Sequence, residues 1–188
     1  MLMMFKDILR TLIFTLVPGL IFAFLVMSAL PTFKKGFKNT IKAFFKSLKN
    51  KDRLFLFLLL VYFFIVIYRT LFQRDFSYDS LSDVFGGWKI FKTQYTGLDY
   101  QVIGNIAMFF PFGLLWALTF EREEKSAKTL LITLLSSLCF SAFIEITQLI
   151  FSKGTFQFSD IVYNTLGGVL GAVIFIIINL IIEKKRSK

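Results

Sequence analysis

The sequence predicts an all-α membrane protein, a five-helix transmembrane bundle with a basic amphipathic interfacial helix. The chain has 188 residues, of which 56% are hydrophobic, which is too apolar for a soluble domain of this length. It contains five apolar runs, each near the roughly 20 residues that a helix needs to cross a bilayer. The net charge of +10 arises in short segments beside these runs, as topology signals do. We therefore expect contact with membrane lipids and no nucleic acid partner.

Residues 1–31 are predicted to form the first transmembrane helix. Its apolar run contains Pro18, which a membrane helix tolerates as a kink. The run is long and carries only a weak small-residue cleavage pattern near Ser28, so we expect a retained helix and not a signal peptide.

Residues 32–53 are predicted to form a basic amphipathic cytoplasmic segment. Its aromatic and aliphatic side chains recur at helical spacing, and lysines fill the positions between them. The apolar positions are Phe33, Phe37, Ile41, Phe44 and Leu48. We interpret the segment as an electrostatic anchor on the inner leaflet, and the alternative is binding of a partner or a specific lipid.

Residues 54–182 are predicted to form a four-helix membrane core, followed by a basic cytoplasmic tail at 183–188. Its one long loop, 73–99, places three aspartates at four-residue spacing among aromatic side chains, namely Asp75, Asp79 and Asp83. This pattern favours a short interfacial helix with a solvated acidic face over a cation site.

The distribution of Lys and Arg predicts the orientation. Segments 32–53, 121–128 and 184–188 hold fifteen of these residues, and the segments on the opposite side hold six. The positive-inside rule therefore places the N-terminus outside and the C-terminus in the cytoplasm of a multi-pass cell-membrane protein.

Polar side chains from four predicted spans fall at one depth near the outer surface. The predicted ligand-binding residues are Arg69, Asn105, Glu145, Gln148, Asp160 and Asn164. Burying a lone carboxylate in a membrane is costly, so Glu145 should be paired, protonated or facing water. Asp160 has a structural alternative as the N-cap of the last helix, and Arg69 either extends to the interface or pairs with one of the two acids. We also expect Gln148 to hydrogen-bond Asn164.

Small residues and one proline are predicted to shape helix packing. Glycines four apart allow two helices to approach closely in lipid, and proline removes a backbone hydrogen bond. The packing residues are Pro111, Gly113, Gly167, Gly168 and Gly171.

The absence of histidine from the sequence excludes histidine-based acid–base and nucleophilic catalysis and the usual zinc sites. The one cysteine, Cys139, rules out an intrachain disulfide. We expect no cofactor and no metal, and whether the protein is an enzyme stays open.

Three motifs occur in order across three helices, at residues 105–113, 141–148 and 160–168. Together they resemble the VanZ-like family over roughly residues 54–180. The resemblance implies a small integral membrane protein, often of Gram-positive bacteria, whose founding type is associated with low-level resistance to the glycopeptide teicoplanin. The positions carried over from the family are Asn105, Pro111, Gly113, Glu145, Gln148, Asp160, Asn164 and Gly168. The sequence departs from the family before Asp160, where it has Thr155, Gln157 and Ser159 in place of charged residues.

The resemblance implies a role in the cell envelope and in antibiotic resistance. Our hypothesis is that the outer polar residues bind a lipid headgroup, a lipid-linked wall precursor or a teicoplanin-type lipoglycopeptide. One alternative is a membrane-embedded enzyme that uses Glu145 and Asp160 as acid and base or to hold a divalent cation. Another is a scaffold that recruits wall enzymes through the amphipathic segment.

Overall fold

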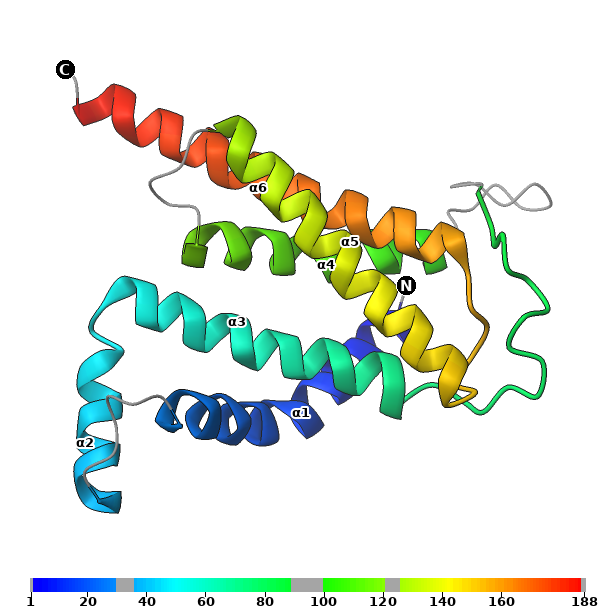
Figure 1. Cartoon of the computed structure of the whole chain (residues 1–188), viewed down its shortest axis with the longest axis horizontal. Coiled ribbons are helices and arrows are strands. Elements are labelled where there is room, and N and C mark those ends of the chain that lie inside the picture. Colours follow the sequence, from blue (N-terminus) through cyan, green and yellow to red (C-terminus); the bar gives the residue numbers. More distant parts are fainter. Residues whose placement is uncertain (1, 30–35, 89–99, 121–125, 187–188) are drawn as a thin grey trace. The chain divides into compact units, whose positions relative to one another are not determined.

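The structure is a computed structural model that describes residues 2–29, 36–88, 100–120 and 126–186 (Figure 1). Its helices are α1 (Leu2–Ser28), α2 (Phe37–Ser47), α3 (Lys51–Ile67), the π-helix η2 (Tyr68–Phe72), α4 (Tyr100–Phe120), α5 (Ser126–Ile150) and α6 (Phe158–Arg186). In this described part of the chain, five helices are long and apolar enough to span a membrane. The prediction of an all-α fold with five spans is therefore confirmed.

The chain divides into two compact units, residues 1–72 and 73–188. In the first unit, α1 packs against α3, and η2 continues α3 without a break. A side chain at Gly19 of α1 would lie 3.4–3.5 Å from Phe64 and Val61 of α3. These are ordinary van der Waals distances, so the packing of α1 on α3 does not require a glycine at this position.

The amphipathic helix α2 also belongs to the first unit and is shorter than the predicted segment. Its Phe44 is buried against Met27 of α1, together with Phe24, Ala43, Leu48, Phe57 and Leu60. The chain leaves α2 after Ser47, and the Asn50 side chain caps α3 by accepting hydrogen bonds from the backbone N–H groups of residues 52 and 53. Residues 30–35 of the predicted segment lie outside the described ranges.

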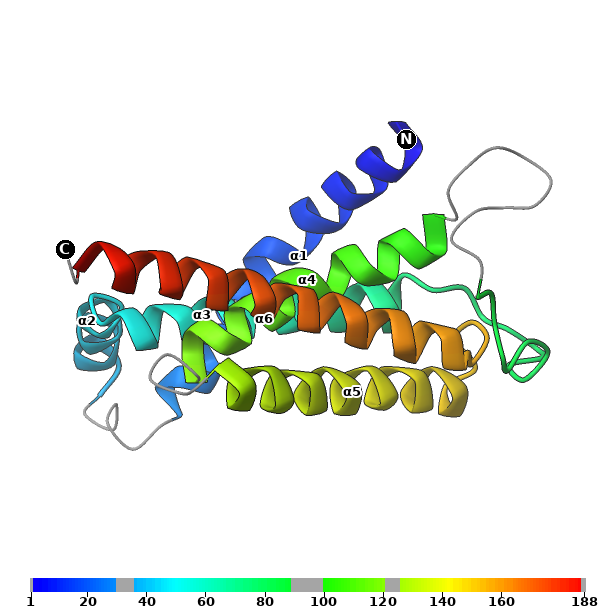
Figure 2. The ribbon, with the colours of Figure 1, turned by 90° about the horizontal axis from the view of Figure 1, so that it is seen from above.

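In the second unit, α6 packs along both α4 and α5 (Figures 1 and 2). Glycines allow the backbones of α4 and α6 to touch directly. A side chain at Gly113 would collide with the carbonyl oxygen of Gly168, and one at Gly167 would collide with that of Ile106. Gly171 meets the backbone of α4 in the same way. Only glycine permits this separation, because any Cβ would force the helices apart.

The side of α5 that is buried in the second unit is polar, whereas its exposed side is apolar. Its buried polar residues recur at intervals of three or four, with Phe140 and Ile144 buried beside them, and are Thr129, Thr133, Ser137, Ser141, Glu145 and Gln148. Ser137 packs directly on Gly168 of α6. This polarity, with small and polar residues inside and aliphatic residues outside, is typical of helices that pack in lipid.

Candidate functional site

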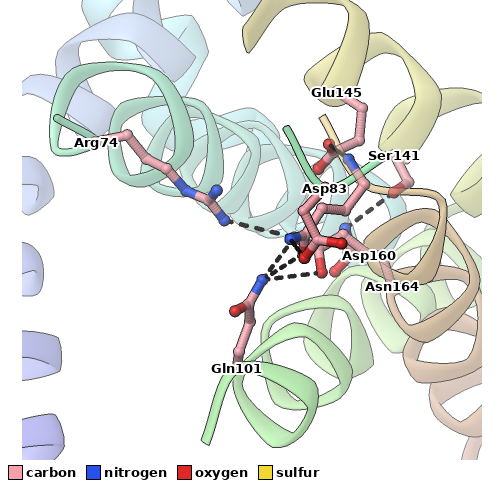
Figure 3. A network of polar contacts seen from close by, with 8 residues as sticks. Arg74, Asp83, Gln101, Ser141, Glu145, Asp160 and Asn164 are labelled. Carbon is pink, nitrogen blue, oxygen red and sulfur yellow. Dashed lines mark hydrogen bonds and ion pairs between the residues drawn. The ribbon is translucent and has the colours of Figure 1, made fainter. Parts of the chain in front are cut away.

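One end of the second unit holds a network of polar side chains, which we call the polar cluster (Figure 3). Its members come from the loop before α4, from all three helices, and from the connection between α5 and α6. They are Arg74, Asp83, Gln101, Ser141, Glu145, Gln157, Asp160 and Asn164. The carboxylates of Glu145 and Asp160 are both buried.

Asp160 lies in the first turn of α6, where the helix dipole favours a negative charge. Its oxygens lie 3.3 and 3.4 Å from Nε2 of Gln101, which donates to them. One oxygen also forms an ion pair of 3.6 Å with Nη2 of Arg74. The helix begins at Phe158, so the interpretation of Asp160 as only an N-cap is wrong. The first-turn position points the carboxylate at α4 and the loop instead.

Glu145 is 1% exposed and supports the start of the next helix. Its Oε2 accepts a hydrogen bond of 3.0 Å from the backbone N–H of Gln157, the residue just before α6. The first N–H groups of a helix have no acceptor within the helix, so a carboxylate from elsewhere satisfies one here. Glu145 therefore has a hydrogen-bond donor in its buried position, as a buried polar group requires.

Gln157 connects the acidic groups to one another. Its amide oxygen accepts from Nε2 of Gln101 at 2.8 Å, and its Nε2 donates to Oδ2 of Asp83 at 2.9 Å. Together with the bond from its backbone N–H to Glu145, these contacts join the loop, α4 and α5 through one residue.

Asn164 lies one turn deeper on α6 and contacts α5. Its Nδ2 donates to the hydroxyl of Ser141 at 2.9 Å. The side-chain oxygens of Asn164 and Gln148 both lack a hydrogen-bond donor among the described residues, so the expected bond between these two side chains is wrong. Gln148 is buried on the same side of α5. The Asn164 carbonyl oxygen makes no hydrogen bond within the described ranges.

Asn105 of α4 is buried beside the Asp160 carboxylate. Its amide nitrogen nevertheless meets hydrogen-bond geometry with none of the residues that the structure describes. One side-chain amide atom of Asn105 on α4 and one of Asn164 on α6 are therefore buried without a hydrogen-bond partner among the described residues.

Arg69, which was expected in the site, belongs to the first unit, where its Nη1 donates to the Thr11 hydroxyl at 3.1 Å. The guanidinium that pairs with Asp160 is that of Arg74. A role for Arg69 in ligand binding stays a prediction.

Sequence reasoning missed five members of the polar cluster. Two of them had a usable signal, because Gln101 lies four residues before Asn105 and Ser141 four before Glu145, on the same helix faces. Arg74, Asp83 and Gln157 lie outside the helices and follow no periodic pattern. Their positions depend on how the loop folds back over the helix ends.

The aspartate row of the long loop does not form the expected helix. Residues 80–83 form a turn, in which Asp83 accepts from the Gly86 N–H as well as from Gln157. Within the described ranges, no group of three His, Cys, Asp or Glu side chains is arranged to hold a metal ion.

The fold and the site define a polytopic helical membrane protein with an acidic, amide-rich cluster buried at one end of its second unit. The family model described as VanZ/LLP1 matches residues 53–179, and the chain therefore belongs to the VanZ/LLP1 family. Protein VanZ of Enterococcus faecium is 34% identical over 91 residues, which cover 48% of this chain and 53% of that protein. The chain thus spans about half the length of this curated relative. No solved structure matches it.

Proposed function

We propose that the protein acts in the cell envelope and lowers sensitivity to teicoplanin-type glycopeptides by binding the polar headgroup of an amphiphile at the polar cluster. Family membership supports the envelope role. The observation that carries the binding role is the convergence of three carboxylates, one guanidinium and several amides at a single end of the helices. Buried ionisable groups in membrane segments commonly mark functional sites.

The composition of the polar cluster favours a ligand that donates hydrogen bonds. Asp83, Glu145 and Asp160 contribute three acidic groups, and the ion pair supplies one guanidinium. Carboxylates accept hydrogen bonds and do not donate them when ionised. A headgroup rich in hydroxyl or ammonium groups fits this excess of acceptors, as in a lipid-linked wall precursor, a phospholipid or the sugars of a lipoglycopeptide.

Access to the polar cluster is through its partly exposed members. Arg74 is 31% exposed, and Asp83 and Gln101 are exposed, whereas Gln157, Asp160 and Glu145 lie beneath them. A headgroup would first meet these three outer side chains. The headgroup would then take the place of Gln101 as a hydrogen-bond donor to the buried carboxylate of Asp160. The excess of Lys and Arg at the opposite helix ends supports an outward orientation for the polar cluster.

Expression of the chain in a susceptible Gram-positive host tests this function. The wild-type chain should raise the minimum inhibitory concentration of teicoplanin, and Asp160→Asn should return it to the empty-vector level. The variant keeps the shape and an acceptor oxygen at the site but removes the negative charge that pairs with Arg74. Asp79→Asn is the matched control, because it makes the same chemical change at an exposed position of the loop before α4.

Membrane abundance of both variants is measured alongside the inhibitory concentration. Full protection by Asp160→Asn at wild-type abundance would contradict the proposal. A wild-type chain that gives no protection at all would contradict the resistance role itself.

A further inference from the structure

The first part of the second unit is a loop at residues 73–88, which we call the cap loop. It is tied to the connection between α5 and α6 by backbone hydrogen bonds of 2.8–3.1 Å. These bonds join Ser77 to Ser152, Asp75 to Gly154, Ser80 to Phe156 and Val84 to Phe158. The backbone of the cap loop is therefore fixed on the helix ends.

The cap loop exposes several large apolar side chains, which is unusual for a loop that faces water. Its Arg74 and Asp83 point inward to the polar cluster. Its large apolar and aromatic side chains are exposed, with Tyr78 at 97% and Phe85 at 74%, and the set consists of Phe76, Tyr78, Leu81, Phe85 and Trp88. The rings of Phe76 and Tyr78 are in contact, with their centroids 5.3 Å apart. A concentration of exposed apolar side chains on one short loop favours an interaction surface.

This surface continues onto the apolar ends of two spanning helices. Ile150 and Phe151 at the end of α5 and Phe158 at the start of α6 are exposed. The rings of Phe85 and Phe158 lie with their centroids 6.5 Å apart, which joins the cap loop to the helix surface. The exposed sides of α5 and α6 are apolar enough to face lipid, and the cap loop adjoins them.

The charges on the cap loop indicate how deep it lies. Asp75 and Asp79 are exposed beside the aromatic side chains, and carboxylates are not stable in the hydrocarbon core. Tyrosine and tryptophan collect at the headgroup level, where one part of the ring is apolar and the other is hydrated. We propose that the aromatic surface of the cap loop is docked in the boundary between phospholipid headgroups and acyl chains. The rim of the polar cluster then opens at headgroup depth.

Fluorescence of Trp88 tests this docking, since the chain has two tryptophans and the other can be removed. Trp116→Phe is a mild change, because the Trp116 indole N–H is buried without a hydrogen bond to any described residue. The variant is reconstituted in phosphatidylcholine vesicles with acyl chains brominated at carbons 6 and 7. Brominated lipid should lower Trp88 emission about twofold or more, and aqueous iodide should have little effect.

Strong quenching by iodide with none by brominated lipid would overturn the proposal, because the cap loop would then be in water. Protection from both quenchers would also overturn it, because a second copy or a protein partner would then cover the surface.

A second probe does not depend on replacing a packed residue. In a Cys139→Ser background, Tyr78→Cys is labelled with an environment-sensitive fluorophore, and Lys185→Cys on the last turn of α6 is the control. We expect brominated lipid to quench the label at position 78 and iodide to quench the label at 185. Equal quenching by iodide at both positions would contradict docking.

Discussion

Glu145→Ala is expected to destabilise the second unit and to abolish protection against teicoplanin. The substitution removes the acceptor of the Gln157 N–H, which lies buried at the start of α6. Leaving such a donor without a partner costs about 1–3 kcal/mol, and the space left by the side chain adds to this cost. Thermal unfolding of the detergent-purified protein, followed by circular dichroism, measures the loss of stability.

Glu145→Gln separates the structural role of this residue from its charge. The glutamine carbonyl can accept the same N–H, so stability should return to near the wild-type value. If the carboxylate takes part in ligand binding, protection should stay lost in this stable variant. Wild-type protection by Glu145→Gln would show that Glu145 serves only to hold α6.

The ion pair between Arg74 and Asp160 is expected to show strong coupling in a double-mutant cycle. Arg74→Met leaves the buried Asp160 carboxylate without its cation, and Asp160→Asn leaves the guanidinium with a neutral partner. Removing one member of a fully buried pair costs about 3–5 kcal/mol, and the partial exposure of Arg74 lowers this to about 1–3 kcal/mol.

The double variant Arg74→Met/Asp160→Asn should be more stable than Arg74→Met alone, because no uncompensated charge remains. Denaturation in detergent of the four proteins of the cycle gives the coupling energy. Lys153→Met is the control for loss of a positive charge in the neighbouring connection. Additive effects of the two substitutions would show that the pair makes no net contribution.

The sequence was a good guide to the helices because a membrane imposes length and polarity on every span. The last span illustrates this, since its apolar run and basic end predicted a helix that the structure extends from Phe158 to Arg186. Helix periodicity also placed Glu145 and Gln148 on one face, and both are buried. These features depend only on local spacing and on the solvent.

The contacts within the polar cluster could not be read in the same way. Asp160 was assigned its neighbours from depth alone, and depth does not distinguish Arg69 from Arg74. Which of the two arginines reaches Asp160 depends on the cap loop. This loop is held over the helix ends by backbone hydrogen bonds to the connection before α6. That pairing leaves no periodic trace in the sequence. Gln157 was noted only as an uncharged residue, yet its side-chain amide makes two of the contacts that hold the polar cluster together and its backbone N–H makes a third.

A structure determined in lipid with a lipid-linked wall precursor or teicoplanin present would test the central claim most directly. We predict density for a headgroup in contact with Arg74, Asp83 and Gln101, with the carboxylates of Glu145 and Asp160 buried behind it. Finding these two carboxylates facing lipid or far apart from each other, with no headgroup at this end of the helices, would contradict the account.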